Sequence, residues 1–231
     1  MDKFLITGAA RGLGLAMTRQ LLERGCQVGA LVRAENDALR EAQAQHGERL
    51  SIHVADVADD ASIRKAFSAV AERLGSLDVL INNAVTYLEG TRPMIEELDL
   101  SIFARTFEVN SVAPLRVIKY GLPLVRRGKR KLIVNVSSEA GSIGDCWRKA
   151  EYAYSMSKSA LNMGSKILQN QLAPEGIKVL VLHPGWFNSS GKGPAPISAE
   201  EASVKVLETI LKPHAVDGPQ YLDPVGKPLP W

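Results

Sequence analysis

Short apolar runs alternate with longer amphipathic segments along this chain, and that alternation limits the fold more than any other feature. The apolar runs are rich in Val, Ile and Leu and lack strict apolar–polar alternation, which is typical of strands covered on both faces. They predict strands over residues 3–7, 27–32, 51–55, 77–82, 131–137 and 178–183, with a last strand near 218–223.

Between these runs the pattern predicts helices over about 12–24, 35–46, 60–74, 98–126, 152–172 and 199–211. Strands that alternate with helices favour a parallel sheet with helices on both faces. We therefore expect an α/β fold: a Rossmann-type, doubly wound parallel sheet of about seven strands in the order 3-2-1-4-5-6-7, in three α/β/α layers. The 231 residues suit a single domain, 1–231, with a short Gly/Pro-rich lid around 188–199.

The bulk composition excludes several classes of partner. A net charge of +3 is too small to indicate nucleic acid or an anionic membrane. No apolar stretch approaches the roughly 20 residues that span a bilayer, and no N-terminal signal is visible. Two distant cysteines, Cys26 and Cys146, favour a reducing, cytoplasmic location. The four histidines show no metal-ligand spacing, so no metal site is expected.

A glycine-rich segment joins the first predicted strand to the first predicted helix. Glycines let the backbone turn tightly and approach a pyrophosphate, and the following helix N-terminus offers free N–H groups and partial positive charge. The spacing is G-x-x-x-G-x-G rather than the general G-x-G-x-x-G. A dinucleotide is therefore expected at Gly8, Arg11, Gly12, Leu13 and Gly14, with a merely structural turn as the alternative.

The second predicted strand runs into Arg33, where NAD-binding proteins usually place an acid that holds the ribose 2′-hydroxyl. Arg33 and Arg11 instead suit a 2′-phosphate, which guanidinium groups bind by charge-assisted hydrogen bonds. These two arginines predict NADP(H) as the preferred cofactor. Glu35 leaves NAD(H) open, because its carboxylate would bind the hydroxyl if it folded back.

Tyr154 alone among the five tyrosines has a lysine, Lys158, four residues later. On the predicted helix 152–172, positions i and i+4 share a face. A free phenol has a pKa of about 10, and we expect the neighbouring ammonium to lower that pKa toward neutrality. The pair is therefore a candidate general acid/base, with an ordinary surface pair as the alternative.

With both motifs present, the chain resembles the short-chain dehydrogenase/reductases over nearly its whole length. Segments 157–162 and 182–186 and the closing Pro230-Trp231 are most similar to the sniffer-type and C-factor-type carbonyl reductases. The resemblance implies a catalytic set of Asn110, Ser138, Tyr154 and Lys158. It also implies cofactor contacts at Asp56, Val57, Asn83, Ala84, Tyr154, Lys158, Pro184, Gly185, Phe187 and Ser189.

The same resemblance implies an NADPH-dependent oxidoreductase that reduces the carbonyl of a ketone or aldehyde to an alcohol. Tyr154 would donate the proton, Ser138 would polarise the carbonyl oxygen, and Asn110 would fix a water that connects Lys158 to solvent. Two alternatives stay open: an NAD(P)-dependent alcohol dehydrogenase working in the oxidising direction, and a non-catalytic NADP(H)-sensing protein on the same fold.

The substrate is expected to be an apolar or aromatic carbonyl compound or alcohol. Candidates for its pocket are Val85, Tyr87, Trp147, Tyr152, Trp186 and Phe187. Arg148 and Lys149 would attract an anionic substrate unless they are simply solvated. Val85 departs from the glycine usual in the family at that position. Helices 98–126 and 152–172 pair subunits in many members, which favours a homodimer over the alternative monomer.

Overall fold

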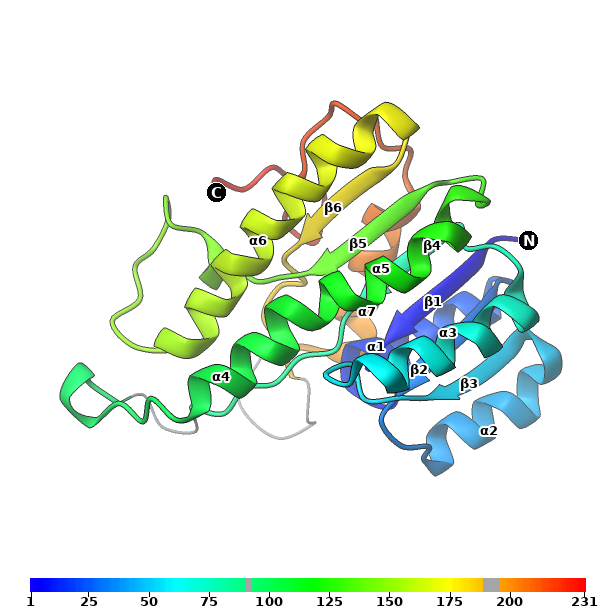
Figure 1. The fold of residues 1–231 in the computed structure, drawn as a ribbon, viewed down its shortest axis with the longest axis horizontal. Coiled ribbons are helices and arrows are strands. Elements are labelled where there is room, and N and C mark those ends of the chain that lie inside the picture. Colours follow the sequence, from blue (N-terminus) through cyan, green and yellow to red (C-terminus); the bar gives the residue numbers. More distant parts are fainter. Residues whose placement is uncertain (90–92, 189–195) are drawn as a thin grey trace.

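The computed structural model describes residues 1–89, 93–188 and 196–231, and a parallel sheet lies at its centre (Figure 1). Within these residues the sheet has seven strands in the order β3-β2-β1-β4-β5-β6-β9, and every neighbouring pair is parallel. The strands are β1 (Lys3–Thr7), β2 (Gln27–Val32), β3 (Leu50–Val54), β4 (Val79–Asn82), β5 (Leu132–Val136), β6 (Lys178–Leu182) and β9 (Tyr221–Leu222). The predicted fold class and strand order are confirmed, and β9 is the strand expected near 218–223.

Helices cover both faces of this sheet. They are α1 (Gly12–Glu23), α2 (Asp37–His46), α3 (Asp60–Leu74), α4 (Ile102–Phe107), α5 (Ala113–Arg126), α6 (Tyr152–Leu172) and α7 (Ala199–Leu211). In Figure 1, α3, α5 and α6 lie in front of the sheet, and α1 and α7 lie behind it. Phe4 and Ile6 of β1 pack into one apolar core, and Leu5 packs into the other, because successive side chains of a strand point to opposite faces.

Side-chain caps fix where several helices begin. The Asn36 side chain accepts a hydrogen bond from the Leu39 N–H (3.0 Å), so α2 starts at Asp37 rather than at 35. Asp59 does the same for α3, because its carboxylate accepts the Ser62 N–H at 2.9 Å. Each cap satisfies a backbone donor that the first helical turn leaves without a partner.

The prediction of one helix over 98–126 was wrong in two respects. The helix begins only at Ile102, because the Asp99 side chain accepts the Ser101 N–H (2.9 Å) in a preceding turn. A π-helical turn, Glu108–Val112, then separates α4 from α5. Such a turn inserts one residue into a helix and is frequent at functional sites. Here it carries Asn110, which is fully buried.

The two ends of the predicted lid are described, while its middle, residues 189–195, lies outside the described residues. The ends form a short parallel pair, β7 (Phe187–Asn188) with β8 (Ile197–Ser198), beside the sheet. The lid and the single-domain organisation stay predictions. Among the described helices, none combines the length and apolarity needed to cross a bilayer.

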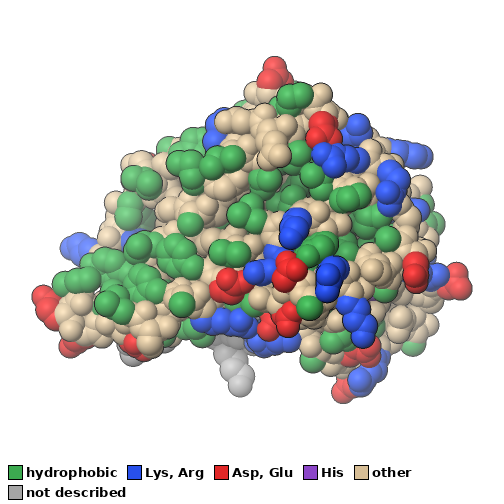
Figure 2. All heavy atoms as spheres, viewed as in Figure 1, with side chains coloured by type: hydrophobic (Ala, Val, Ile, Leu, Met, Phe, Trp, Pro, Cys, Tyr) green, Lys and Arg blue, Asp and Glu red, His purple; other side chains and the backbone are tan. Residues whose placement is uncertain are grey.

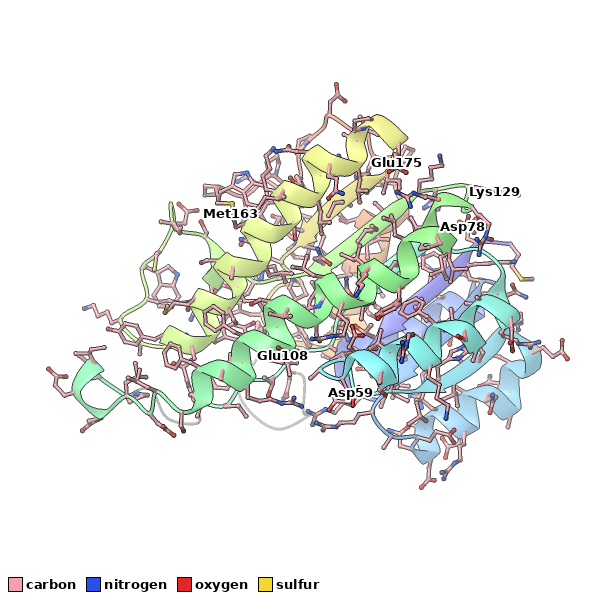
Figure 3. The ribbon with its side chains drawn as sticks, viewed as in Figure 1. Asp59, Asp78, Glu108, Lys129, Met163 and Glu175 are labelled. Atoms are coloured by element: carbon pink, nitrogen blue, oxygen red, sulfur yellow. The ribbon has the colours of Figure 1, made fainter. Side chains whose placement is uncertain are left out.

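Backbone and side chains close tightly at the amino ends of the strands. Asp78 lies just before β4, is 4% exposed, and accepts backbone N–H groups of Lys3 (2.8 Å) and Lys129 (2.6 Å). Figure 3 shows Asp78 and Lys129 together at this end of the sheet, with Glu175 nearby. A Cβ on Gly128 would lie 1.8 Å from the Leu77 carbonyl oxygen, so the backbone beside Asp78 is closely packed.

Candidate active site

The glycine loop lies at the opposite edge, where the carboxyl ends of the strands meet. Gly8 has φ +68°, a conformation that side chains other than glycine rarely adopt. A Cβ on Gly14 would lie 2.4 Å from the Gly8 carbonyl oxygen and 2.6 Å from the Asn83 side-chain nitrogen. Asn83 ties the loop to β4, because its amide nitrogen donates to the Thr7 carbonyl at 3.0 Å. The glycine spacing therefore follows from close packing of loop, helix and strand.

The N-terminus of α1 is left open to a ligand. Its N-cap residue, Arg11, makes no side-chain cap hydrogen bond, and the first turn holds no acidic residue. Gly12 and Leu13 of that turn line an adjacent cavity. Unpartnered N–H groups and the helix dipole together favour an anion such as a pyrophosphate at this point.

The cavity has a volume of about 560 Å³ and lies where the strand order reverses, between β1 and β4. Ligands of doubly wound folds bind at this switch point. Predicted cofactor residues that line the cavity are Gly8, Arg11, Gly12, Leu13, Arg33, Asp56, Val57, Asn83, Ala84 and Phe187. Predicted cofactor residues outside its lining are Gly14, Tyr154, Lys158, Pro184 and Gly185. Ser189 lies outside the described residues.

Arg105, from α4, lines the same cavity and was missed by the sequence interpretation. Its guanidinium lies 3.4 Å from the Asp56 carboxylate. A backbone hydrogen bond from Ala58 lowers the pKa of Asp56, and Arg105 and Arg33 lower it further against a smaller opposing effect of burial. No sequence motif marks Arg105, because only the tertiary fold brings α4 to the end of β3.

The choice between the two dinucleotides depends on the groups around the end of β2. Arg11 and Arg33 line the cavity and are exposed. The Glu35 carboxylate, which would favour NAD(H), lies 3.5 Å from the Arg40 guanidinium and is outside the cavity lining. Both arginines therefore lie at the cavity, whereas the Glu35 carboxylate is paired with Arg40 outside its lining.

Ser138 follows β5 and is 8% exposed. Its hydroxyl lies close enough to Tyr154 to lower the pKa of that phenol, so the fold brings together two predicted residues that are 16 positions apart in the sequence. The Ser138 hydroxyl also donates to the Glu139 carboxylate at 2.7 Å. The Tyr221 hydroxyl donates to the Ser138 carbonyl at 2.5 Å, which fixes the backbone of this serine from β9.

Lys158 lies beside Tyr154 on α6 and is only 2% exposed. Its Nζ donates to the Val136 carbonyl (2.9 Å) and lies 5.7 Å from the centroid of the Tyr154 ring. Burial lowers the pKa of Lys158 to about 7, because desolvation penalises the ammonium form. The lysine is thus held at the carboxyl end of β5, next to both partners.

The expectation that Lys158 lowers the pKa of Tyr154 was wrong for the protein alone. Burial raises the pKa of the Tyr154 phenol; the Ser138 hydrogen bond opposes this shift, and the Glu139 charge adds to it. Desolvation has the largest effect on the pKa of the Tyr154 phenol. It also lowers the pKa of the neighbouring Lys158 amine. The four-residue spacing correctly predicted that Tyr154 and Lys158 are neighbours, but it could not predict how deeply they are buried.

Asn110 connects the π-helical turn to the loop after β4. Its amide accepts the Thr86 N–H (2.9 Å) and donates to the Thr86 carbonyl (3.0 Å) and to the Ser157 hydroxyl (3.0 Å). Both amide hydrogens are therefore committed to protein groups. Asn110 holds one cavity-lining residue, Thr86, against the helix that carries Tyr154.

Glu89 is a second residue that the sequence interpretation missed. It is 6% exposed, and its two carboxylate oxygens accept the backbone N–H groups of Ala153 and Tyr154, each at 3.1 Å. The N-cap position of α6, Glu151, has φ +67° and no side-chain cap of its own. A carboxylate 65 residues before Tyr154 therefore caps the helix at the tyrosine itself.

The aromatic candidates for a substrate pocket are placed unevenly. Val85 and Phe187 line the cavity. The Tyr87 ring lies edge-on to the Tyr154 ring with centroids 5.4 Å apart, and the Trp186 indole N–H donates to Glu139 at 3.3 Å. Trp147 is 61% exposed, and Tyr152 is half-buried at the start of α6.

Arg148 is not free to attract an anionic substrate. Its guanidinium binds the carboxylates of both Glu139 and Glu151, and its side chain is 11% exposed. The Tyr87 hydroxyl donates to the same Glu151 at 3.1 Å. The neighbouring Lys149 is exposed. Glu139, Arg148 and Glu151 therefore form a network of paired charges with two carboxylates and one guanidinium.

Comparison with known proteins assigns the family. The profile of the short chain dehydrogenase family matches residues 2–196. The chain belongs to the short-chain dehydrogenase/reductase family. It is 35% identical to the C-signal protein of Myxococcus xanthus over 158 residues, which is 68% of this chain and 94% of that protein.

Two solved structures are similar over the full length of this chain. Carbonyl reductase Sniffer of D. melanogaster superimposes with a TM-score of 0.93 at 28% identity, and all of both chains is covered. An NADPH-bound carbonyl reductase from chicken fatty liver gives a TM-score of 0.89 at 30% identity, with 100% of this chain and 99% of that chain covered. The predicted family and the resemblance to carbonyl reductases are confirmed, and the chain is an oxidoreductase of this family.

Proposed function

We propose that this enzyme reduces the carbonyl group of a ketone or aldehyde to an alcohol, with NADPH as the preferred cofactor. The observation that carries this proposal is the cluster at the carboxyl ends of the strands: buried Ser138 lies near Tyr154, and the buried Lys158 Nζ lies 5.7 Å from the centroid of the Tyr154 ring. A cavity with an open helix N-terminus lies at the same edge of the sheet. The carbonyl reductases of similar structure support the assignment.

The residues around the cavity fit a dinucleotide. A Cβ at Gly14 would fill the close approach of loop and helix, and the first turn of α1 has donors to spare for phosphate oxygens. Gly8 and Gly12 would let the backbone approach the pyrophosphate, and Asp56 would accept a hydrogen bond from the adenine amino group. When bound, the reduced nicotinamide supplies the hydride.

The protein's own groups then handle the oxygen and its proton. When a substrate binds, the Ser138 hydroxyl would turn its one proton from Glu139 to the carbonyl oxygen, and this interaction would strengthen as negative charge develops there. Tyr154 gives its proton to that oxygen, completing the alcohol. A raised pKa suits this role, because the phenol holds its proton until an alkoxide is present to take it. Lys158 holds the ribose and, through water bound near Asn110, returns a proton to Tyr154.

Tyr154→Phe tests the reaction. General acid catalysis is typically worth about 10²–10⁴-fold, so we expect kcat to fall by that factor while NADPH still binds. NADPH oxidation with a panel of aromatic ketones measures turnover, and fluorescence titration measures binding. The control is Tyr120→Phe, which removes a hydroxyl on α5 that donates to the exposed Asp60 carboxylate. Near-normal turnover of Tyr154→Phe would overturn the proposed mechanism and leave the non-catalytic alternative.

The cofactor preference is tested separately. Arg11 and Arg33 line the cavity while Glu35 is paired with Arg40, so we expect a lower Michaelis constant for NADPH than for NADH. Arg33→Ser should raise the Michaelis constant for NADPH by about tenfold and change that for NADH little, since a hydrogen bond to a charged group is worth about 1.5–3 kcal/mol. A clear preference of the wild type for NADH would contradict the assignment.

The same residues serve the oxidising direction, so an alcohol dehydrogenase remains the second candidate.

We further propose a homodimer formed through α5 and α6, and a cytoplasmic location. Figure 2 shows hydrophobic side chains over this face, and Leu115, Met163 and Ile167 are 41%, 64% and 58% exposed. Met163 projects from the outer face of α6 (Figure 3). Light scattering should give a dimer mass that Met163→Glu reduces to the monomer mass; a monomeric wild type would refute the dimer.

A further inference from the structure

Glu139 places a carboxylate beside the hydroxyl that the proposed reaction uses to hold the carbonyl oxygen. Its Oε2 accepts the Ser138 hydroxyl proton at 2.7 Å, and its Oε1 accepts the Trp186 indole N–H at 3.3 Å. The side chain is 24% exposed, so a small molecule can approach it. We therefore expect a substituent next to a carbonyl group that is bound at Ser138 to lie close to this carboxylate.

The negative charge of Glu139 is only partly compensated. Its cationic partner, Arg148, is shared with a second carboxylate, that of Glu151. His183 Nδ1 lies 3.6 Å from Glu139, but burial lowers the pKa of His183, so the ring is neutral at pH 7. Lys158 is bound to the Val136 carbonyl, and among the described side chains it forms no ion pair with Glu139.

The carboxylate also remains ionised at neutral pH. Burial by itself would raise the pKa of Glu139, but the Ser138 hydrogen bond, the charges of Arg148 and of His183 (which is protonated at acid pH) and the Trp186 hydrogen bond together lower it. The Ser138 bond is charge-assisted, which is the strong kind. Glu139 therefore presents a fixed negative charge at the place where a substrate meets Ser138.

We propose that Glu139 makes this site selective by charge: it rejects carbonyl compounds that carry a carboxylate next to the reacting carbonyl, and it favours those that carry an ammonium or hydroxyl group there. The inference rests on the proposed carbonyl reductase function and names its substrate class. Like charges that are brought together in a partly desolvated site repel strongly, and opposite charges attract. An ammonium or hydroxyl substituent would donate to Oε2, which among the described residues accepts a hydrogen bond only from the Ser138 hydroxyl, whereas Oε1 accepts from both Arg148 and Trp186.

The competing explanation is that Glu139 only anchors Arg148 and thereby orders the segment before α6. That role would affect all substrates equally. A charge-selective role changes the ratio between matched substrates, so the ratio distinguishes the two explanations.

The test uses the full-length enzyme with NADPH and three aryl ketones of similar shape: phenylglyoxylate, its methyl ester and α-aminoacetophenone. For the wild type we expect kcat/KM for the acid to be at least about tenfold below that for the ester, and the amine to exceed the ester. Glu139→Gln should bring the three within about threefold of one another, and Glu139→Asp should preserve the wild-type order. Glu72→Gln, an exposed carboxylate on α3, removes the same charge at a distance and should change nothing.

The outcomes separate this inference from the function on which it rests. Reduction of the ester without discrimination against the acid would overturn the charge selectivity and leave the reductase function standing. No reduction of any ketone would overturn the reductase function itself. If Glu139→Gln does not fold, as judged by thermal melting, competition supplies the answer in the wild type. Benzylammonium should then inhibit reduction of the ester at least about tenfold more strongly than benzoate, and equal inhibition would refute the inference.

Discussion

The two edges of the sheet are built from similar residues but in opposite ways. At the amino edge of β1 and β4, Asp78 accepts two backbone N–H groups, and the backbone around Gly128 packs closely against Leu77. At the carboxyl edge, a cavity of about 560 Å³ stays open and polar groups are buried next to it. Around Asp78 the amino edge satisfies a buried charge with backbone donors, whereas the carboxyl edge places titratable groups beside a cavity.

The two edges also differ in how well their buried charged groups are stabilised by hydrogen bonds. Asp78 is buried with hydrogen bonds from two strand ends, so it stabilises the fold. Lys158 is buried with one carbonyl acceptor, and desolvation lowers its pKa to about 7. A group held in an unfavourable state of this kind is expected at a functional site, because catalysis and stability make different demands.

The largest expected effect is that of Lys158→Met, which should lower kcat by about 10²-fold or more because the phenol loses its proton-relay partner. The same change should stabilise the cofactor-free protein below pH 7. The folded-state pKa of Lys158 is lowered from 10.5 to about 7, so the unfolded chain binds the extra proton between those values and wild-type stability rises with pH across that window.

Thermal melting of both proteins from pH 6 to pH 10 measures this difference. The advantage of Lys158→Met should be constant below pH 7 and should shrink as the pH rises above it. An advantage that does not change with pH would show that the lysine is not desolvated in the folded protein.

Asp78→Ala should produce the opposite pattern at the amino edge. Two buried N–H groups lose their acceptor, so we expect the free energy of unfolding to fall by about 2–4 kcal/mol. Urea denaturation measures this loss. Per folded molecule, kcat/KM should stay within about twofold of the wild type, because the edges are far apart and act independently. A large loss of kcat in the folded variant would mean that the two edges are coupled.

Glu89→Gln tests a contact that should affect both stability and turnover, because Glu89 binds the backbone N–H of Tyr154. The amide leaves one α6 donor without its acceptor and removes a charge from the helix N-terminus, so stability should fall by about 1 kcal/mol. We also expect kcat to fall by about tenfold with an unchanged Michaelis constant for NADPH, because Tyr154 itself donates one of the two bonds. Steady-state kinetics of the purified variant measure this split.

The control is Glu97→Gln, an exposed carboxylate in the segment before α4. A loss of stability in Glu89→Gln without any loss of kcat would limit Glu89 to holding the fold.

The sequence predicted the strands and most helices because apolar periodicity and glycine placement are local signals. It did not predict the π-helical turn at Glu108–Val112, since one inserted residue barely disturbs the apolar pattern. Nor did it indicate Arg105 or Glu89, whose partners Asp56 and Tyr154 lie 49 and 65 positions away in the chain. Such pairs follow from the order of strands and loops rather than from spacing.

The sequence by itself determined the α/β architecture, the glycine loop and the spacing that puts a phenol and an amine on one helical face. The tertiary structure decided the ionisation of that pair, because desolvation depends on what every other element places around it. It also decided how the charges of Glu139, Arg148 and Glu151 pair, since no local pattern in the sequence indicates those contacts. Local patterns fix the backbone, whereas burial and pairing of charges are properties of the assembled fold.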